Sequence, residues 1–446
     1  MLQSVLIANR GEIARRVIRG CRALGIRSVA VYSEADAGWP HVADADQAVA
    51  IGPPPARESY LDVDRILNAA RRTEAEAIHP GYGFLSENWR FARACEAAGL
   101  VFVGPSWRVI QQMGDKVGAR RLMAAAGVPV VPGSDGPVES VEAAHEAAAR
   151  TGYPVMIKAA AGGGGIGMMK VKDEAGLAAA FSSAQRRAQS AFGAGALFLE
   201  RYLEGARHVE VQIFGDASGR VLHLHERECS IQRRHQKLVE ESPAPQLSAT
   251  LKARLIEAAV AGAQTVGYVN AGTMEFIVRG DEFYFLEMNT RLQVEHPVTE
   301  EVTGLDLVQA QLRVASGEPL PWTQGQVTQR GSSIECRIYA EDPAKGFLPS
   351  PGRLSRLVLP DGPGVRVECG VAEGVEVSVH YDPLLAKLIT VGGTRGEAIE
   401  RMSAALASFV VEGVKTVIPF HQRVMQSAFF QTGAVHTQMI EQGVFS

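Results

Sequence analysis

Two glutamates and an asparagine are the residues of this sequence best suited to holding a divalent cation. Glu275 and Glu287 lie in two apolar segments, 273–278 and 283–288, that read as strands. Asn289 lies two residues beyond Glu287 and would share its face of the strand. Carboxylate and amide oxygens are ligands that Mg²⁺ accepts together with substrate phosphates. The pattern predicts a magnesium site; solvated positions on the outer face of an antiparallel sheet are the alternative.

The short connection between these strands decides which residues face each other. A three-residue loop over 280–282 would place Arg279 opposite Phe283 and Glu275 opposite Glu287. Two carboxylates at that distance repel each other unless a cation lies between them. The expected register therefore supports the prediction of a bound metal ion.

The segment 289–297 continues the alternating pattern, so that Arg291, Gln293 and Glu295 would point to one side. A cation, an amide and a potential general base that converge would fit a small oxyanion such as bicarbonate. A stabilising surface ion pair is the alternative.

A cluster of glycines over 162–167 follows an apolar strand that contains Lys158. The cluster matches G-x-G-x-x-G, but a strand follows it instead of a helix, so a dinucleotide site is not expected. It also lacks the G-K-[ST] of a P-loop. A glycine-rich hairpin suits a flap whose N–H groups cover phosphates, and a plain surface hairpin is the alternative. Lys158 favours the flap, because a lysine in an apolar strand needs an anionic partner.

The charged stretch 226–241 looks basic at its centre but is balanced. Its four arginine and lysine residues are matched by four glutamates, and the whole chain has 45 Lys+Arg against 49 Asp+Glu. A net charge of -4 argues against a nucleic-acid-binding protein. The stretch has neither helical nor strand periodicity, which argues against a plain structural face.

The elements that must position these residues fall into distinct regions. The first hundred residues alternate strands and helices, which predicts a parallel, doubly wound sheet. The strands are expected at 4–8, 28–32, 75–78 and 101–103, and the helices at 12–24 and 60–72. The turn after the first strand has a single glycine, Gly11, so a dinucleotide role is not expected there either.

The rest of the chain reads as a small α+β unit, a strand-rich segment and a final mixed region. Strands are expected at 155–159, 168–171, 334–338, 353–359 and 375–379, and helices at 116–126, 140–150, 173–190 and, closing the chain, 395–409. The stretch 317–331, rich in proline, glycine and glutamine, reads as a boundary.

Composition limits the class of protein. The chain has 446 residues, enough for roughly three domains, and 46% hydrophobic residues with 21% charged residues are ordinary globular values. Its five cysteines are scattered singly, which predicts neither a disulfide framework nor a zinc site and favours a reducing compartment. We recognise no secretory signal and no apolar run long enough to span a membrane, so a cytoplasmic protein is expected.

Eleven stretches, taken in this order, resemble the biotin carboxylase family of biotin-dependent carboxylases. They lie at 7–16, 79–88, 102–106, 113–116, 162–168, 207–212, 226–237, 274–276, 287–300, 335–343 and 347–352. They span nearly the whole chain and are jointly specific. The resemblance implies an α/β and α+β multidomain fold: a Rossmann-like N-terminal domain (1–114), an ATP-grasp domain (115–316) with a lid at about 131–203, and a mixed C-terminal domain (330–440).

The resemblance also implies roles for individual residues. The residues implied to line the nucleotide and biotin site are Lys116, Lys158, Gly164, Gly165, Glu200, Arg201, Tyr202, Leu203, His208, Gln232 and His235. The residues implied to bind magnesium or manganese are Glu275, Glu287 and Asn289. The residues implied to bind bicarbonate are Lys237, Arg291, Gln293 and Val294, and Glu295 is implied to be the base that deprotonates it. Arg337 is implied to stabilise the biotin enolate, and Tyr82 and Gly83 to lie near biotin.

The implied reaction is the ATP- and bicarbonate-dependent carboxylation of biotin, through carboxyphosphate. The sequence contains no Met-Lys-Met biotinylation site (Met168-Met169-Lys170 in the lid is not one), so biotin is expected on a separate carrier protein. The implied partners are that biotin carboxyl carrier protein, the carboxyltransferase subunits and a second copy of the chain in a homodimer. Nucleic acid and membrane are not expected as partners.

Two lid positions depart from most of the family. Ile166 stands where most relatives have lysine or arginine; the urea-type carboxylases also have isoleucine there. Met169 stands where arginine is frequent. His235 is usual in acyl-CoA systems and favours an acyl-CoA acceptor, acetyl-CoA first; propionyl-CoA, pyruvate and urea types are alternatives. A different ATP-grasp carboxylate–amine ligase would have no reason for the 79–88 motif or Arg337. A non-catalytic nucleotide-binding module would have no need of Arg291 and Glu295.

Overall fold

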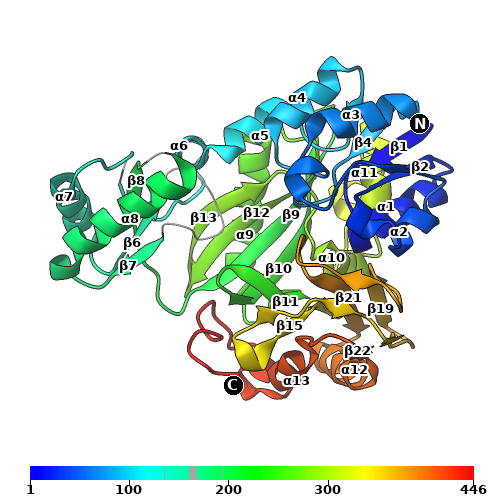
Figure 1. The fold of residues 1–446 in the computed structure, drawn as a ribbon. Coiled ribbons are helices and arrows are strands. Elements are labelled where there is room, and N and C mark those ends of the chain that lie inside the picture. The colour runs from blue at the N-terminus through cyan, green and yellow to red at the C-terminus, as the bar shows by residue number, and fades with distance from the viewer. Residues whose placement is uncertain (135, 160–167, 194, 446) are drawn as a thin grey trace.

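The computed structural model describes residues 1–134, 136–159, 168–193 and 195–445. They form a sheet-rich body from which a small unit of strands and helices projects (Figure 1). The glycine cluster predicted at 162–167 lies outside the described residues. None of the described helices has the length and apolar character needed to cross a membrane.

The described N-terminal strands form a five-stranded parallel sheet, as the alternation of strands and helices predicted. The strand order is β3-β2-β1-β4-β5. The strands are β1 (Ser4–Ile7), β2 (Arg27–Tyr32), β3 (Gln47–Ala50), β4 (Ala77–His79) and β5 (Val101–Phe102), and the helices are α1 (Gly11–Ala23), α2 (Pro40–Asp44), α3 (Val63–Arg72), α4 (Trp89–Ala97) and α5 (Trp107–Gly114). The turns after β1 and β4 meet at the carboxyl edge of the sheet, where Asn9 Nδ2 donates to Pro80 O (2.8 Å) and Tyr82 O (2.7 Å).

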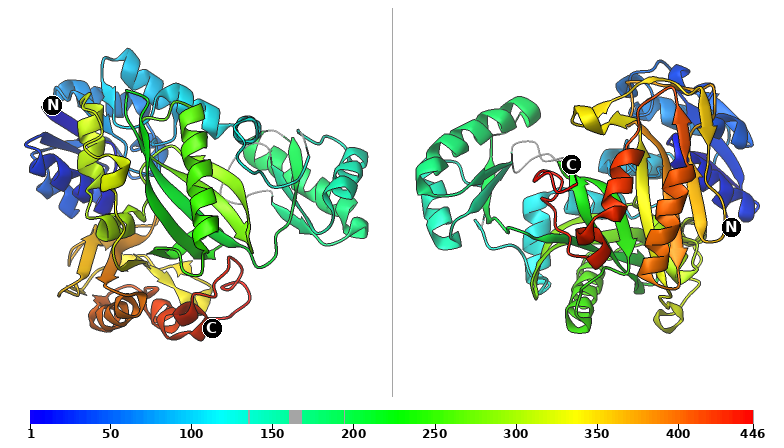
Figure 2. Two further views of the ribbon diagram at one scale, coloured as in Figure 1. Left: turned by 180° about the vertical axis from the view of Figure 1, so that it is seen from behind. Right: turned by 90° about the horizontal axis from the view of Figure 1, so that it is seen from below.

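The projecting unit is an antiparallel sheet covered by helices and has its own apolar core. Its elements are α7 (Val141–Thr151), β6 (Val155–Ala159), β7 (Met169–Val171), α8 (Leu177–Phe192) and β8 (Leu197–Arg201), with strand order β7-β6-β8. Helix α6 (Lys116–Ala125) leads into it. Seen from below, it stands apart from the N-terminal sheet, with the central sheet between them (Figure 2). We call this unit, residues 131–203, the lid.

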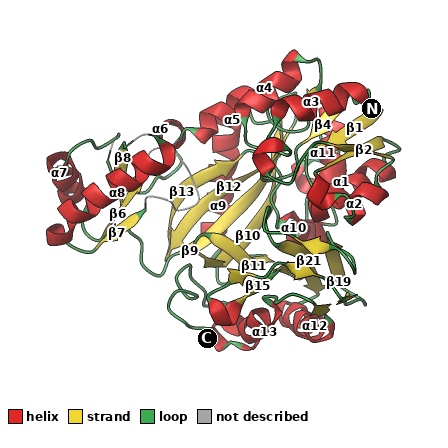
Figure 3. Cartoon of the chain, viewed as in Figure 1, coloured by secondary structure: helices red, strands yellow, loops and turns green. Residues whose placement is uncertain are grey.

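The described central strands form one antiparallel sheet with the order β13-β12-β9-β10-β11-β14-β21-β19 (yellow in Figure 3). The strands are β9 (Arg207–Gly215), β10 (Val221–Arg233), β11 (Gln236–Ser242), β12 (Asn270–Arg279), β13 (Glu282–Asn289), β14 (Ser332–Tyr339), β19 (Val365–Cys369) and β21 (Leu384–Gly392). The sheet runs across the boundary expected at 317–331, because β11 pairs with β14. Side chains from both sides of that boundary therefore share one sheet.

Helices and short strands cover this sheet. The helices are α9 (Ala249–Thr265), α10 (His296–Thr303), α11 (Leu307–Ala315), α12 (Arg395–Ser408), α13 (Ile418–Gln426) and α14 (Ala428–Thr432). The short strands are β15 (Glu341–Asp342), β16 (Leu348–Pro349), β17 (Gly352–Arg353), β18 (Arg356–Val358), β20 (Glu376–Val377) and β22 (Val410–Glu412), and the 3-10 turns are Glu34–Asp36, Ala56–Glu58, Glu174–Gly176, Gln324–Gln326 and Pro343–Lys345. The helix expected to close the chain, α12, is followed by α13 and α14.

The hairpin of β12 and β13 brings Glu275 opposite Glu287, as predicted, but by a different route. Arg279 pairs with Glu282 and not with Phe283, so the expected three-residue loop is wrong and the turn has two residues. A bulge between the pairs Phe276–Phe285 and Glu275–Glu287 inserts one extra residue in β13 and restores the register.

The strand expected to continue through 289–297 is wrong, because β13 ends at Asn289. The chain leaves the sheet when Thr290 N donates to the Glu87 side chain (Oε1, 3.0 Å). The segment 290–295, which we call the bicarbonate loop after its implied ligand, then leads into α10.

The stretch 226–241 forms the β10–β11 hairpin in the middle of the sheet. Both faces of these strands are largely buried, which explains why the sequence has no alternation of apolar and polar residues. Its turn residues Arg234 (φ 49°) and His235 (φ 68°) are both left-handed, as a type I′ hairpin requires.

Candidate active site

A cavity of about 1210 Å³ lies where the N-terminal domain, the lid, the central sheet and the C-terminal region meet. The predicted site residues that line it are Tyr82, Gly83, Lys116, Lys158, Glu200, Arg201, Tyr202, Leu203, His208, Gln232, His235, Lys237, Glu275, Glu287, Asn289, Arg291, Gln293, Val294 and Arg337. Glu295 is fully buried directly behind Lys237 and Arg337. Gly164 and Gly165 lie outside the described residues.

The lid end of the cavity combines cations with an apolar slot. Lys158 of β6 forms an ion pair with Glu200 of β8, and Arg120 Nη1 lies 3.0 Å from Glu200 Oε1. Apolar side chains of the lid and the central sheet line the slot: Val131, Met156, Phe198, Leu203, Ile277, Phe285 and Leu286. The anionic partner that the sequence required for Lys158 is therefore Glu200, and the slot can hold an aromatic base next to cations that can bind phosphates.

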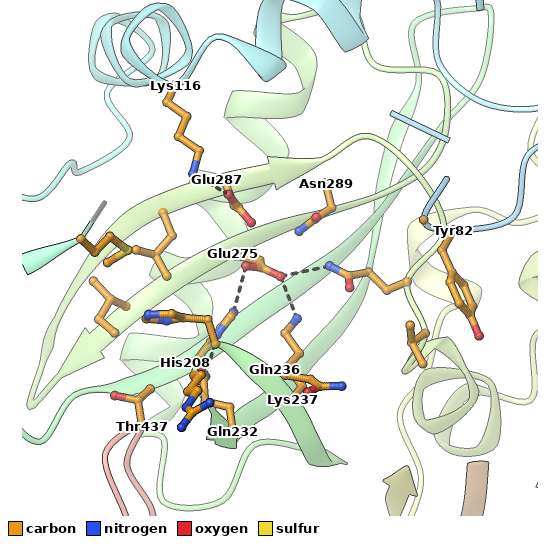
Figure 4. A pocket seen from close by; sticks show the side chains of 18 of the residues that line it. Tyr82, Lys116, His208, Gln232, Gln236, Lys237, Glu275, Glu287, Asn289 and Thr437 are labelled. Carbon is orange, nitrogen blue, oxygen red and sulfur yellow. Dashed lines mark hydrogen bonds and ion pairs between the residues drawn. The ribbon is translucent and has the colours of Figure 1, made fainter. Parts of the chain in front are cut away.

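Glu275, Glu287 and Asn289 lie together on the central sheet below Lys116 (Figure 4). Lys116 Nζ lies 3.8 Å from Glu287 Oε2, whose side chain is 46% exposed to the cavity. Partial loss of hydration at the cavity wall and the charge of Glu275 raise the pKa of Glu287. The two carboxylates therefore repel each other, as the sequence predicted.

These three residues fit a divalent cation. A cation shared by Glu275 and Glu287 would remove the repulsion that raises the pKa of Glu287. Asn289 Oδ1 accepts from Arg291 Nη2 at 2.7 Å but keeps a second lone pair. Since all three offer oxygen ligands beside a cavity, the donor set matches Mg²⁺ or Mn²⁺ bound together with phosphate oxygens.

Lys237 of β11 is the centre of a buried charge cluster (Figure 4). Its Nζ lies 2.5 Å from Glu210 Oε2, 2.7 Å from Glu275 Oε1 and 2.6 Å from Glu295 Oε1. Burial opposes the charge of Lys237, but the three carboxylates outweigh it and raise the pKa of the ammonium well above its ordinary value. Lys237 therefore stays charged and can bind an anion that competes with these glutamates.

Glu295 lies between two cations. Its Oε1 accepts from Lys237 and its Oε2 from Arg337 Nη2 at 2.9 Å. Burial alone would raise the pKa of Glu295, but Lys237 and Arg337 outweigh burial and lower it. The carboxylate is therefore ionised, and its basicity increases when an anion draws these cations away.

Arg337 of β14 joins Glu295 to a second glutamate. Its Nε donates to Glu240 Oε1 at 2.6 Å, and burial raises the pKa of Glu240 despite this contact. One guanidinium nitrogen, Nη1, lies 3.5 Å from the Tyr339 hydroxyl, so it is held weakly. Arg337 lines the cavity and has donors to offer a developing oxyanion there.

The bicarbonate loop is held to the sheet and to the N-terminal domain. Arg291 Nε donates to Glu87 Oε2 at 2.9 Å, and Gln293 Nε2 donates to Glu275 Oε1 at 3.1 Å. The guanidinium, the amide and Lys237 therefore reach one region of the cavity although the loop is not a strand.

His208 and Gln232 lie together near the carboxylates (Figure 4). His208 Nε2 lies 3.1 Å from Glu275 Oε2, and Gln232 Nε2 lies 3.1 Å from His208 Nδ1. Burial opposes the imidazolium, but Glu275 outweighs it and raises the pKa of His208. His235, at the tip of the hairpin, faces the same cavity, and burial lowers its pKa.

Sequence reasoning missed several residues that hold this site. Arg227 is fully buried and binds Glu210 (Nε to Oε1, 2.5 Å), which in turn binds Lys237. Glu87 anchors Arg291, and Glu240 anchors Arg337. Two signals in the sequence could have indicated these residues. Each is a charged residue that lies either in an apolar strand or in one of the stretches that match the family.

A lid that faces a central sheet across a cavity, with lysines on one side and paired carboxylates on the other, defines a ligase of the ATP-grasp class. Three family models match consecutive parts of the chain: "Biotin carboxylase, N-terminal domain" at 1–110, "Carbamoyl-phosphate synthase L chain, ATP binding domain" at 115–323 and "Biotin carboxylase C-terminal domain" at 335–442.

Individual proteins match over nearly the whole chain. A biotin carboxylase of Halalkalibacterium halodurans is 54% identical over 441 residues, which cover 99% of this chain and 97% of the relative. A pyruvate carboxylase subunit of Methanothermobacter thermautotrophicus is 52% identical (99% and 90% covered), and a methylcrotonoyl-CoA carboxylase subunit of Arabidopsis thaliana is 53% identical (99% and 60%).

Among solved structures, the biotin carboxylase domain dimer of Hydrogenobacter thermophilus 2-oxoglutarate carboxylase, in complex with MgADP, ADP and bicarbonate, superposes with a TM-score of 0.95. It is 47% identical, and the match covers 100% of this chain and 99% of that one. The chain belongs to the biotin carboxylase family, ATP-dependent ligases that act in biotin-dependent carboxylases.

Proposed function

We propose that this chain uses ATP, Mg²⁺ and bicarbonate to carboxylate biotin on a separate carrier protein, and that the residues of the cavity divide this work. The observation that carries the proposal is the position of Glu295, which is buried between Lys237 and Arg337, two residues that line the cavity. The Hydrogenobacter domain binds MgADP, ADP and bicarbonate, ligands whose charges suit the cations and carboxylates that line this cavity.

In the first step, Lys116 and Lys158 bind the phosphates of ATP, and the slot between lid and sheet holds the base. Glu275, Glu287 and Asn289 would hold Mg²⁺, and the bound ion would supply positive charge against the phosphates. Lys237, Arg291, Gln293 and Val294 bind bicarbonate.

Bicarbonate itself prepares the base. An anion between Lys237 and Arg291 competes with Glu295 for the Lys237 ammonium. The pKa of Glu295 then rises toward its ordinary value, and the carboxylate accepts the bicarbonate proton. The bicarbonate oxygen attacks the γ-phosphorus, the bond to ADP breaks, and carboxyphosphate forms.

In the second step, carboxyphosphate breaks down to CO₂ and phosphate, and the phosphate takes the ureido proton of biotin. Arg337 donates to the enolate oxygen that develops, and the ureido nitrogen attacks CO₂. We assign biotin to the part of the cavity that Tyr82 and Gly83 line. Tyr82 lies across the pocket from Lys116 (Figure 4).

The metal assignment predicts a specific defect for Glu287→Gln. The variant loses one of two cation-binding carboxylates, so the Mg²⁺ concentration that gives half-maximal ATP turnover should rise, and turnover should fall by about 10²-fold or more. The measurement is a Mg²⁺ titration of ADP release, with circular dichroism to verify the fold. Glu282→Gln, on the exposed end of the same strand, serves as the matched control and should titrate like the parent. An unchanged Mg²⁺ requirement in Glu287→Gln would remove this residue from the metal site.

For the final acceptor we propose an acyl-CoA, with acetyl-CoA first. The support is His235 in the hairpin turn and the relative that belongs to a methylcrotonoyl-CoA carboxylase. The test is to capture the assembled carboxylase from its own cells through this chain and to measure transfer of labelled bicarbonate to acetyl-CoA, propionyl-CoA, pyruvate and urea. Labelled malonyl-CoA is expected as the main product, and labelled oxaloacetate would overturn the assignment.

We further propose a homodimer, as in the Hydrogenobacter domain, that works with a biotin carboxyl carrier protein and carboxyltransferase subunits. The five cysteines are free and buried, which supports a reducing, cytoplasmic setting. We assign the three domains to residues 1–114, 115–316 and 330–440.

A further inference from the structure

Lys387 of β21 is a fully buried lysine to which none of the roles above applies. The exposed fraction of its side chain is 0%. Its Nζ donates to the backbone oxygen of Val294 at 2.8 Å and lies 3.1 Å from Glu12 Oε1. A buried ammonium is destabilising unless its partners are close and well oriented, so Lys387 and these two partners must hold one another in place.

The Val294 carbonyl is part of the peptide bond that joins Val294 to Glu295. The preceding carbonyl is also held, because His296 Nδ1 lies 2.8 Å from Gln293 O. Residues 290–295 belong to no helix or strand, so these contacts replace the ladder of hydrogen bonds that would otherwise fix their backbone. Lys387 therefore contributes directly to the placement of the peptide that carries Glu295.

Glu12, the other partner of Lys387, connects it to the wall of the cavity. The Tyr82 hydroxyl donates to Glu12 Oε1, the same oxygen that Lys387 contacts. The Tyr82 ring lines the cavity and lies 5.8 Å, centroid to Nζ, from Lys387. The Glu12 side chain is enclosed, since only 3% of it is exposed.

We propose that Tyr82, Glu12 and Lys387 form a relay of positioning residues that places the Val294–Glu295 peptide, and that links the biotin side of the cavity to the bicarbonate loop. The inference rests on the proposed function, since it assigns a purpose to the loop. A ligand that contacts Tyr82 would change the bond from its hydroxyl to Glu12, and Lys387 would transmit the change to Val294. None of the three side chains takes part in bond making; they act through Glu295.

The first test is Tyr82→Phe in the bicarbonate-dependent ATPase assay without biotin. Loss of the hydroxyl removes one hydrogen bond to Glu12, and a rise of about 3–10-fold in the KM for bicarbonate is expected, with the KM for ATP unchanged. Because the assay contains no biotin, a lost contact to biotin cannot produce this shift. An unchanged KM for bicarbonate would overturn the relay.

The matched control is Tyr60→Phe. Tyr60 also lies in the N-terminal domain, and its buried hydroxyl donates to a carboxylate, Asp36 Oδ2, at 2.6 Å. The variant loses the same kind of bond away from the bicarbonate loop, and its KM for bicarbonate should equal that of the parent. An equal rise in both tyrosine variants would reduce the effect to general loosening of the domain and overturn the relay.

The second test is a double-mutant cycle of Tyr82→Phe with Glu12→Gln. If the hydroxyl acts through Glu12, its loss in the Glu12→Gln background adds little to the KM for bicarbonate, whereas full additivity would contradict the relay. Lys387→Met should raise the KM for bicarbonate more than Tyr82→Phe does. Lys387→Arg should give a KM between those of the parent and Lys387→Met. If Lys387→Met fails to fold, the Tyr82–Glu12 cycle decides. A parent protein without bicarbonate-dependent ATPase would refute the proposed function itself, whereas an active parent with unmoved variants would refute only the relay.

Discussion

Glu295→Gln is expected to lower both biotin carboxylation and the biotin-independent ATPase by ~10²–10⁴-fold. The amide keeps the size of the side chain, and its one oxygen can still accept from Lys237 or from Arg337, but it cannot accept the bicarbonate proton. Since proton removal precedes attack on the γ-phosphate, both ATP cleavage and biotin carboxylation should slow. Both rates can be measured in one preparation, by ADP release and by incorporation of labelled bicarbonate into free biotin.

Binding must be separated from chemistry in this variant. Lys237 keeps Glu210 and Glu275 as partners, so the fold and the affinity for nucleotide should be close to those of the parent. Glu257→Gln, an exposed position on α9, provides the matched control and should keep full activity. Carboxylation near the parental rate in Glu295→Gln would remove the residue as general base.

Arg337→Ala is expected to separate the two halves of the reaction. Biotin carboxylation should fall by ~10²–10⁴-fold, because the developing enolate oxygen loses its donor. The biotin-independent ATPase should fall by less than about tenfold, because Lys237 still holds Glu295 and loss of one cation raises the basicity of that carboxylate. The measurement is the ratio of the two rates in the same preparation.

The contact of Arg337 with Glu295 and Glu240 makes a second variant useful. Arg337→Lys retains a buried positive charge for both glutamates, so a loss of carboxylation in both variants identifies the missing donor as the cause. If Arg337→Ala abolished the ATPase as completely as Glu295→Gln, Arg337 would belong to bicarbonate activation and the division of roles would be wrong.

Local patterns predicted the N-terminal sheet, much of the lid and the two facing carboxylates of the central sheet. The alternation of strands and helices in the first hundred residues matches the parallel sheet, and the apolar segments around Glu275 and Glu287 form the expected hairpin. The prediction that the two glutamates face each other was correct although the predicted loop length was wrong. A bulge in β13 compensates for the shorter turn. A bulge leaves no periodic signal, so the sequence alone could not show it.

Long-range contacts were not predictable. The alternation in 289–297 suggested a strand, but Thr290 bonds to Glu87, about two hundred residues earlier in the chain, and the segment becomes a loop. The buried partners of Lys237 and Arg337 come from β9, β11, β12 and the bicarbonate loop. Only the sheet order and these contacts bring those segments together. Lys387 lies in a segment for which the sequence suggested no role, and its importance becomes visible only beside Val294 and Glu12.

Biotin carboxylase activity can be assayed directly as the ATPase activity of the purified chain with bicarbonate, Mg²⁺ and free biotin. We expect slow ADP release that requires bicarbonate, acceleration by biotin, and transfer of labelled carbon from bicarbonate to biotin in the same reaction. ADP release that ignores bicarbonate and biotin but requires an amine and a carboxylate would identify a different ATP-grasp ligase. Nucleotide binding without any turnover would identify a non-catalytic module, and either result would contradict the account.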